Sequence, residues 1–266
     1  MKMKDSKQAI IIIICAILLV GLIVGFVIAY KNKNNSSNIT GTTTNNSSAT
    51  DISSKYDNID YGTSQELNTT TITNGGSYDL TGEYNSITIN TKDSVQLNLN
   101  GVKITNTSGP AINIIEAKEV NIVLNGENTI VSTTTEDLDG AIYSKADLIF
   151  SGTGSLTITS NYDGIVSKDT LVIKSGTYII NSDDDGIRGK DNVAIVDGTF
   201  TINAKGDGIK STNEEDTTKG YVAIDGGTFN ITSVTDAIQA ETELVIKGGT
   251  FTIKTTGTSS SLSTKG

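Results

Sequence analysis

Short runs in which apolar and polar residues alternate fill the chain from residue 87 onward. Representative runs read ITI at 87–89, VQLNL at 95–99 and NIVL at 121–124, and they are separated by Gly, Asn and Asp. Alternation over a few residues is typical of half-buried strands, whereas no stretch after residue 31 keeps the 3.6-residue apolar period of a helix. The pattern therefore predicts an all-β domain built from short strands.

The strands recur in a repeat that is clearest when segments are aligned by their glycines. Four of them read LVIKSGTYII at 171–180, VAIVDGTFTI at 193–202, VAIDGGTFNI at 222–231 and LVIKGGTFTI at 244–253. An Asp-Gly-Ile motif or a weaker form of it accompanies the repeats, with its aspartate at Asp139, Asp163, Asp185, Asp207 and Asp236. We expect the glycine to permit a sharp turn. Intervals of 22 to 29 residues between these aspartates indicate a solenoid.

Each repeat predicts three short strands whose apolar positions face one axis. The third strand contributes Ile142, Ile165, Ile187, Ile209 and Ile238. An aromatic row with inward parity, expected to stack in the core, contains Tyr178, Phe200, Phe229 and Phe251. Strand side chains alternate between faces, and equivalent residues of stacked coils lie about 4.8 Å apart. Three inward walls therefore predict a parallel β-helix with about 22 to 24 residues per coil.

The N-terminal part begins with an uncharged apolar run at residues 9–30, AIIIIICAILLVGLIVGFVIAY. A run of this length spans a bilayer, and Lys2, Lys4 and Lys7 before it favour a cytoplasmic N-terminus. A cleaved signal peptide has a shorter apolar region, so we expect a transmembrane signal anchor preceded by a cytoplasmic segment at residues 1–8. The protein is therefore expected in the cell membrane, single-pass, with its β-helix outside the cell.

A linker rich in Asn, Ser and Thr follows at residues 31–66. It contains too few apolar residues to fold alone, which predicts a flexible tether. Residues 67–266 are then expected to form the β-helix domain.

The composition narrows the possible chemistry. The 266 residues include no His and one Cys, Cys15, and carry a net charge of −10. Ser-His-Asp triads, imidazole metal sites, intramolecular disulfides and thiolate clusters are therefore excluded. Nucleic acid needs a clustered positive surface and is not an expected partner. Carboxylate oxygens suit hard cations, so Ca²⁺ is the expected cofactor.

Stacking the repeats would align the motif aspartates in one row about 5 Å apart, the Asp column. Such a row of like charges needs a divalent cation or backbone N–H donors. The stretch SDDDGIRGKD at 182–191 adds carboxylates, and the expected metal ligands are Asp163, Asp183, Asp184, Asp185, Asp207 and Asp236. The alternative, in which each aspartate only caps its own turn, is favoured at Asp139, Asp163 and Asp236. Calcium is favoured at Asp184, Asp185 and Asp207.

A row of cations is expected to face outward beside the Asp column. This cation row consists of two neighbouring lines, one with Arg188, the only arginine of the chain, and Lys210, and the next with Lys168 and Lys190. Rungs about 5 Å apart are close to the length of one sugar unit, so an acidic glycan such as polygalacturonate could lie along the row, with Arg188 making bidentate carboxylate contacts. The alternative is that Asp169 and Asp191 neutralise the lysines within each coil.

The repeats resemble a known family. DGIVSK at 163–168 and DGIRGK at 185–190, joined by strands such as VAIVDGTFTI, are similar to the clostridial carbohydrate-binding parallel β-helix proteins related in fold to pectate lyases, over roughly residues 75–255. The resemblance implies a right-handed β-helix, bound calcium, and binding of cellulose and pectin-type acidic polysaccharide outside the cell. The matching aspartates are Asp163, Asp185, Asp207 and the degenerate Asp236.

The pattern departs from the family at its C-terminal end. Ala237 replaces the motif glycine, and the coil after Leu244 ends in TSSSLSTKG without Asp-Gly-Ile. Solenoids need terminal caps, so we expect either a truncation or end-to-end contact with a partner at this coil.

These features favour a membrane-anchored, calcium-containing β-helix that binds polysaccharide without cleaving it. The first alternative is a polysaccharide lyase, in which Arg188 with Lys190 or Lys210 would remove the proton that calcium acidifies. The second is a structural stalk or adhesin that needs neither calcium nor sugar.

Overall fold

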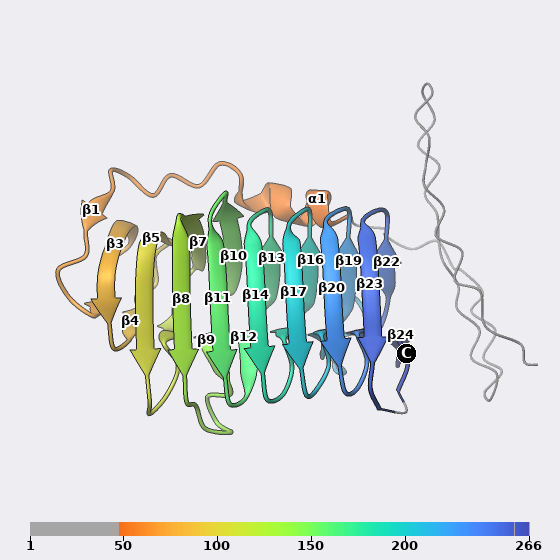
Figure 1. Ribbon diagram of the computed structural model, residues 1–266. Helices are drawn as coiled ribbons and strands as arrows, with labels where there is room; N and C mark the ends of the chain where they lie inside the picture. Colours follow the sequence, from red (N-terminus) through yellow and green to blue (C-terminus); the bar gives the residue numbers. More distant parts are fainter. Residues whose placement is uncertain (1–47, 258, 266) are drawn as a thin grey trace, which may run out of the picture.

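The computed structural model describes residues 48–257 and 259–265. In this part of the chain nearly all regular structure is β-strand, arranged in two sheets whose strand pairs are parallel. Figure 1 shows the coils stacked side by side along one axis in sequence order. The predicted all-β parallel solenoid is therefore confirmed.

The first sheet supplies two walls of each coil. The strands of the first wall are β7 (Glu119–Asn125), β10 (Asp147–Gly152), β13 (Thr170–Ile173), β16 (Asn192–Ile195), β19 (Tyr221–Ile224) and β22 (Leu244–Ile246). Those of the second wall are β8 (Glu127–Ser132), β11 (Ser155–Ser160), β14 (Thr177–Ser182), β17 (Thr199–Ala204), β20 (Thr228–Ser233) and β23 (Thr250–Thr255). The long strand β5 (Val95–Asn106) pairs with both β7 and β8 and so joins the two walls. On its other side lie β3 (Gly76–Tyr84) and then β1 (Gln65–Glu66).

The second sheet forms the third wall. Its strands are β2 (Thr71–Ile72), β4 (Ile87–Asn90), β6 (Ile112–Glu116), β9 (Gly140–Ser144), β12 (Asp163–Ser167), β15 (Ile187–Gly189), β18 (Ile209–Ser211), β21 (Ile238–Ala240) and β24 (Leu262–Thr264). The predicted isoleucine row lies in register across this sheet, and all of its members are fully buried. The alternation of apolar and polar residues therefore predicted correctly both where these strands lie and which of their side chains face the core.

The aromatic row stacks in the core as predicted. Tyr178 and Phe200 have ring centroids 5.0 Å apart, and the next two steps, to Phe229 and then to Phe251, are 4.7 and 4.6 Å. The planes are within 8° of parallel, because each ring sits on the same strand position one coil further on. Tyr178, Phe200 and Phe229 are buried in this stack, so they are unavailable to sugars and contribute to stability. Phe251 at the end of the stack is partly buried.

The glycine of the Asp-Gly-Ile motif has a different role from the predicted one. Gly186 is not among the glycines with positive φ, so a left-handed turn does not explain it. A Cβ at this position would lie 2.5 Å from the carbonyl oxygen of Gly208 in the next coil. The glycine is needed because neighbouring coils approach closely at this bend.

Part of the segment predicted to be a tether is ordered and packs on the first wall. This part, residues 48–57, is called the strap and contains helix α1 (Ala49–Ser53) and the 3-10 turn η1 (Ser54–Tyr56). Its Ala49 and Ile52 are buried against an outward-facing apolar row made of Ile149, Val172, Ala194 and Ala223. The apolar contact explains why so polar a segment does not remain free.

Polar contacts hold the strap at both ends. The backbone N–H groups of Ala49 and Thr50 donate to the Asp225 carboxylate at 3.2 and 2.8 Å. The Tyr56 hydroxyl donates to Asp147 at 2.8 Å. The strap therefore connects several coils, and Figure 1 shows it lying along them.

No helix among residues 48–257 and 259–265 is long and apolar enough to cross a membrane. The predicted membrane span at residues 9–30 lies outside the described residues, as do residues 1–8 and 31–47. In the last described coil, Leu244, Ile246, Phe251 and Ile253 are only partly buried. The end-to-end contact expected at this coil stays a prediction.

Candidate functional site

The Asp column exists and lies at the bend that leads into the third wall. Asp163, Asp185, Asp207 and Asp236 are all buried, with Asp163 only 1% exposed. The backbone N–H of Asp185 donates to Oδ1 of Asp163 at 2.9 Å, and the same bond recurs from Asp207 to Asp185 and from Asp236 to Asp207, at 2.7 Å each. Each of these four carboxylates thus caps the turn of the following coil, whereas the sequence predicted that it would cap its own. Asp139 differs, because the backbone N–H of Asp163 donates to its backbone carbonyl oxygen at 2.8 Å.

The other carboxylate oxygens of Asp163, Asp185 and Asp207 face cations. Arg188 donates from Nε to Oδ2 of Asp163 at 2.7 Å and from Nη2 to Asp139. Lys210 Nζ lies 2.8 Å from Oδ2 of Asp207 and 3.4 Å from Oδ2 of Asp185. The side chains of Arg188 and Lys210 are only 19% and 22% exposed. Both therefore act mainly as counter-ions of the buried carboxylates.

Burial sets the protonation behaviour of these groups. It raises the pKa of Asp163 to about 7, because neighbouring carboxylates add to the desolvation cost and Arg188 offsets only part of it. Burial also raises the pKa of Asp185. Burial by itself would lower the pKa of Arg188 and of Lys210, but the facing carboxylates outweigh it and raise both. Both cations therefore stay protonated.

One group of carboxylates has the donor set of a cation site. Asp163, Asp184 and Asp185 each offer an oxygen, and the three oxygens lie within 4.8 Å of one another. Gly206 leaves room beside them, because a Cβ there would lie 2.5 Å from a carboxylate oxygen of Asp184 and of Asp185. Ca²⁺ takes six to eight oxygens, so backbone carbonyls and water would complete such a site.

The other expected metal ligands have different neighbours. Asp183 pairs with Lys205 at 2.7 Å, and Asp236 accepts from Gln239 and Ser263 at 3.1 and 2.5 Å. Asp207 belongs to the Lys210 pair. The structure therefore brings together three of the six predicted ligands.

Lys168 and Lys190 flank a small surface hollow beside the column, lined by Val166, Ser167, Lys168, Arg188, Lys190 and Thr212. Lys168 lies 3.6 Å from Asp139 and over the ring of Tyr143, and Lys190 lies 3.3 Å from the exposed Glu215. The predicted partners Asp169 and Asp191 do not take these roles among the described residues, because Asp191 pairs with Lys219. Lys190 is the more accessible of the two lysines, at 40% exposed.

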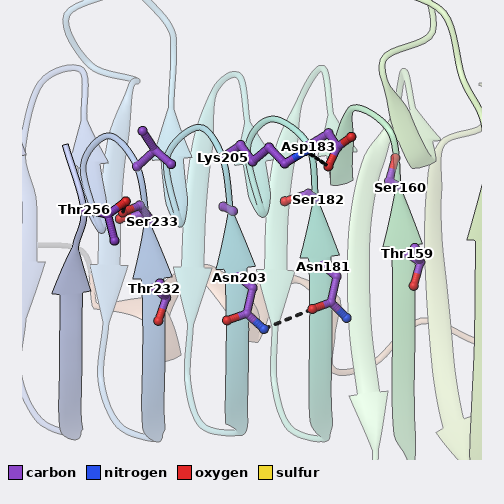
Figure 2. A pocket seen from close by; sticks show the side chains of 12 residues that line it. Thr159, Ser160, Asn181, Ser182, Asp183, Asn203, Lys205, Thr232, Ser233 and Thr256 are labelled. Atoms are coloured by element: carbon purple, nitrogen blue, oxygen red, sulfur yellow. Dashed lines mark hydrogen bonds and ion pairs between the residues drawn. The ribbon is translucent and has the colours of Figure 1, made fainter.

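Sequence reasoning missed a groove of about 280 Å³ on the outer side of the second wall (Figure 2). It crosses strands β11, β14, β17 and β20 where they end. Its lining is Thr159, Ser160, Asn181, Ser182, Asp183, Asn203, Ala204, Lys205, Thr232, Ser233, Val234 and Thr256, here called the polar groove. The signal in the sequence was the Thr or Asn that directly follows the inward isoleucine in these coils.

Comparisons with known proteins agree with the resemblance drawn from the repeats. The family model described as "Carbohydrate-binding domain-containing protein" matches residues 66–266. Among solved structures, a polysaccharide lyase-like protein from C. thermocellum, described as a gadolinium derivative, matches with a TM-score of 0.62 and 30% sequence identity. The match covers 78% of this chain and 94% of that one. A search among curated proteins gave no match.

Proposed function

The chain belongs to the family of carbohydrate-binding domain-containing proteins, and on this basis we propose that its β-helix binds polysaccharide at the cell surface without cleaving it. The ligand is a polysaccharide of the cellulose or pectin type. The coils are proposed to wind right-handed, since connections between parallel strands almost always do.

The ion pairs of Arg188 with Asp139 and Asp163 are the observation that favours binding without cleavage. A lyase needs a basic side chain free to take a proton from the sugar. Arg188 is held between two carboxylates, and the pKa shifts of Arg188 and Lys210 keep both protonated. Lys190 is the remaining candidate base, and its partner is the exposed Glu215.

A lyase stays the second candidate function. It is favoured by the likeness to a protein described as polysaccharide lyase-like. It would use Lys190 at the hollow, in place of the pair with Arg188 or Lys210.

Acidic polysaccharide is proposed to bind at the hollow between Lys168 and Lys190. Two lysines at its rim supply positive charge that the Asp column does not fully neutralise, since Lys190 pairs only with an exposed glutamate. An exposed pair of this kind contributes little and exchanges readily for a uronate carboxylate.

Calcium is proposed to bind at Asp163, Asp184 and Asp185. Three close carboxylate oxygens support it, as does Gly206, whose missing Cβ allows the carboxylates of Asp184 and Asp185 to approach the backbone. Gadolinium, present in the similar structure, is also a hard cation that prefers oxygen ligands. Bound calcium would neutralise the carboxylates and so stabilise the coil.

Membrane attachment through residues 9–30 is the remaining part of the proposal and depends on the sequence alone. It leaves residues 31–47 as a tether between the membrane and the strap.

A depletion assay tests the binding proposal. The full chain, in a non-glycosidic detergent with Ca²⁺, is mixed with insoluble polygalacturonate or cellulose, and the protein left in solution is measured. Depletion by at least one polymer is expected, and Lys168→Gln/Lys190→Gln should weaken depletion by polygalacturonate more than Lys92→Gln does, a matched exposed lysine far along the chain. If neither polymer depletes the protein from solution, the proposed function is contradicted.

A further inference from the structure

The polar groove has no role in the sites described so far, and it has the form of a chain-binding subsite. We propose that it binds a single extended chain of a neutral polysaccharide, running across the coils along the solenoid axis. The inference rests on the proposed polysaccharide binding and gives uncharged glycans a site separate from the Lys168 and Lys190 hollow.

The groove repeats one polar rung per coil. Thr159 pairs in register with Asn181, Asn181 with Asn203, and Asn203 with Thr232. Successive rungs are about 4.8 Å apart, close to the length of one sugar unit in an extended glycan. A chain lying along the axis would therefore meet an equivalent hydrogen-bonding side chain at each sugar.

The cross-section of the groove suits a narrow chain. Its floor consists of small buried residues, namely Ser160, Ser182, Ala204 and Ser233. Longer side chains rise on both sides, from the strand rungs on one side and from Asp183, Lys205 and Thr256 on the other (Figure 2). Val234 also lines the groove. The methyl groups of the threonines and Val234 offer apolar contact for the C–H groups of a sugar ring.

The amides of the two central rungs are oriented for sugar hydroxyls. Asn203 Nδ2 donates to Asn181 Oδ1 at 3.0 Å, which fixes both side chains (Figure 2). This leaves Asn203 Oδ1 as an acceptor and Asn181 Nδ2 as a donor at the groove. A sugar hydroxyl is both donor and acceptor, so it can satisfy either atom.

The groove carries no net charge that would attract uronates. Its only charged lining residues are Asp183 and Lys205, which neutralise each other at 2.7 Å. A neutral glycan needs no counter-ion there, whereas a polyuronate gains no net attraction, because the carboxylate of Asp183 offsets the charge of Lys205. The groove and the hollow therefore separate neutral from acidic polysaccharide.

Calorimetric titration of the full chain in non-glycosidic detergent, with cellohexaose as the neutral probe and a polygalacturonate oligomer as the acidic one, tests this assignment. Asn181→Ala/Asn203→Ala removes both amides, and Val234→Arg places a long side chain at an exposed position of the groove. The matched control is Asn230→Ala, an exposed asparagine on β20 outside the groove. Thermal unfolding of each variant verifies the fold.

We expect both groove variants to bind cellohexaose at least tenfold more weakly than wild type, with the Asn230 variant and all polygalacturonate affinities unchanged. If both groove variants bind cellohexaose as tightly as wild type does, the assignment of neutral glycans to the groove is wrong, while the proposed function stands. If wild type binds the polygalacturonate oligomer but not cellohexaose, the groove assignment is overturned and the proposed function stands. If wild type binds neither probe, both the groove assignment and the proposed polysaccharide binding are overturned.

Discussion

Arg188 and Asp163 lie on neighbouring coils and form a buried ion pair, with Nε of the guanidinium 2.7 Å from Oδ2 of the carboxylate. The same carboxylate accepts the backbone N–H of Asp185 through its other oxygen. One aspartate thus connects a turn and a cation of the next coil. Arg188 and Lys210 are therefore part of the same buried network as the Asp column, whereas Lys190 pairs with Glu215.

Removing the guanidinium should destabilise the protein strongly. Arg188→Gln leaves Asp139 and Asp163 without their counter-ion, and breaking a buried pair in this way costs about 3 kcal/mol or more. Urea unfolding measures the change. The control is Lys103→Gln, which removes an exposed pair with Glu83 and should cost less than about 1 kcal/mol. Equal stability of the two variants would show that Arg188 is not a structural counter-ion.

Asp163 should make stability depend on pH. Its pKa is raised to about 7 in the folded protein from an ordinary 3.8, so between these values the folded state binds the proton more tightly than the unfolded state. The stability that this group contributes is present at low pH and is lost as pH rises toward 7. In EDTA, the stability of wild type relative to Asp163→Asn should fall by about 1 to 3 kcal/mol between pH 5 and pH 7.5. A pH-independent difference would contradict the raised pKa.

Calcium should act through Asp184 and not through Asp183. After treatment with EDTA, Ca²⁺ at about 100 times its Kd is expected to raise Tm of wild type by about 5 °C or more. Asp184→Asn should abolish the rise, whereas Asp183→Asn should retain it, since Asp183 pairs with Lys205. A calcium response that disappears only in the Asp183 variant would move the site away from the proposed group.

The strap should contribute to stability although most of it is polar. Ile52 is 3% exposed, and truncating a buried isoleucine typically costs about 2 to 4 kcal/mol. Ile52→Ala should therefore lower the unfolding free energy by this amount, while Lys55→Ala, an exposed neighbour in the same segment, should not. Identical denaturation curves for the two variants would mean that the strap does not hold the coils.

The sequence was sufficient to predict the coil but not its surface. Ile165, Ile187 and Ile209 could be placed because a period of two residues within strands and about 22 between coils leaves one consistent stacking. The order of the aromatic stack followed from the same register. The strap was missed because Ala49 and Ile52 are isolated apolar residues in a polar segment, and their partners are far away in sequence.

Side-chain partners across coils were the part that could not be predicted. The sequence placed Arg188 outward in a cation row, and whether it turns toward a glycan or toward Asp163 depends on the burial of that carboxylate. The polar groove was missed although Thr or Asn follows the inward isoleucine in these coils, because outward polar residues are expected on any half-buried strand and do not by themselves indicate a groove.

The most direct test of binding without cleavage is the ultraviolet absorbance of unsaturated product, followed while the full chain is incubated with polygalacturonate and Ca²⁺. We expect no rise in absorbance over the buffer control, in a sample where depletion shows that the protein is bound. A steady rise that disappears in Lys190→Gln would contradict binding without cleavage and identify a lyase.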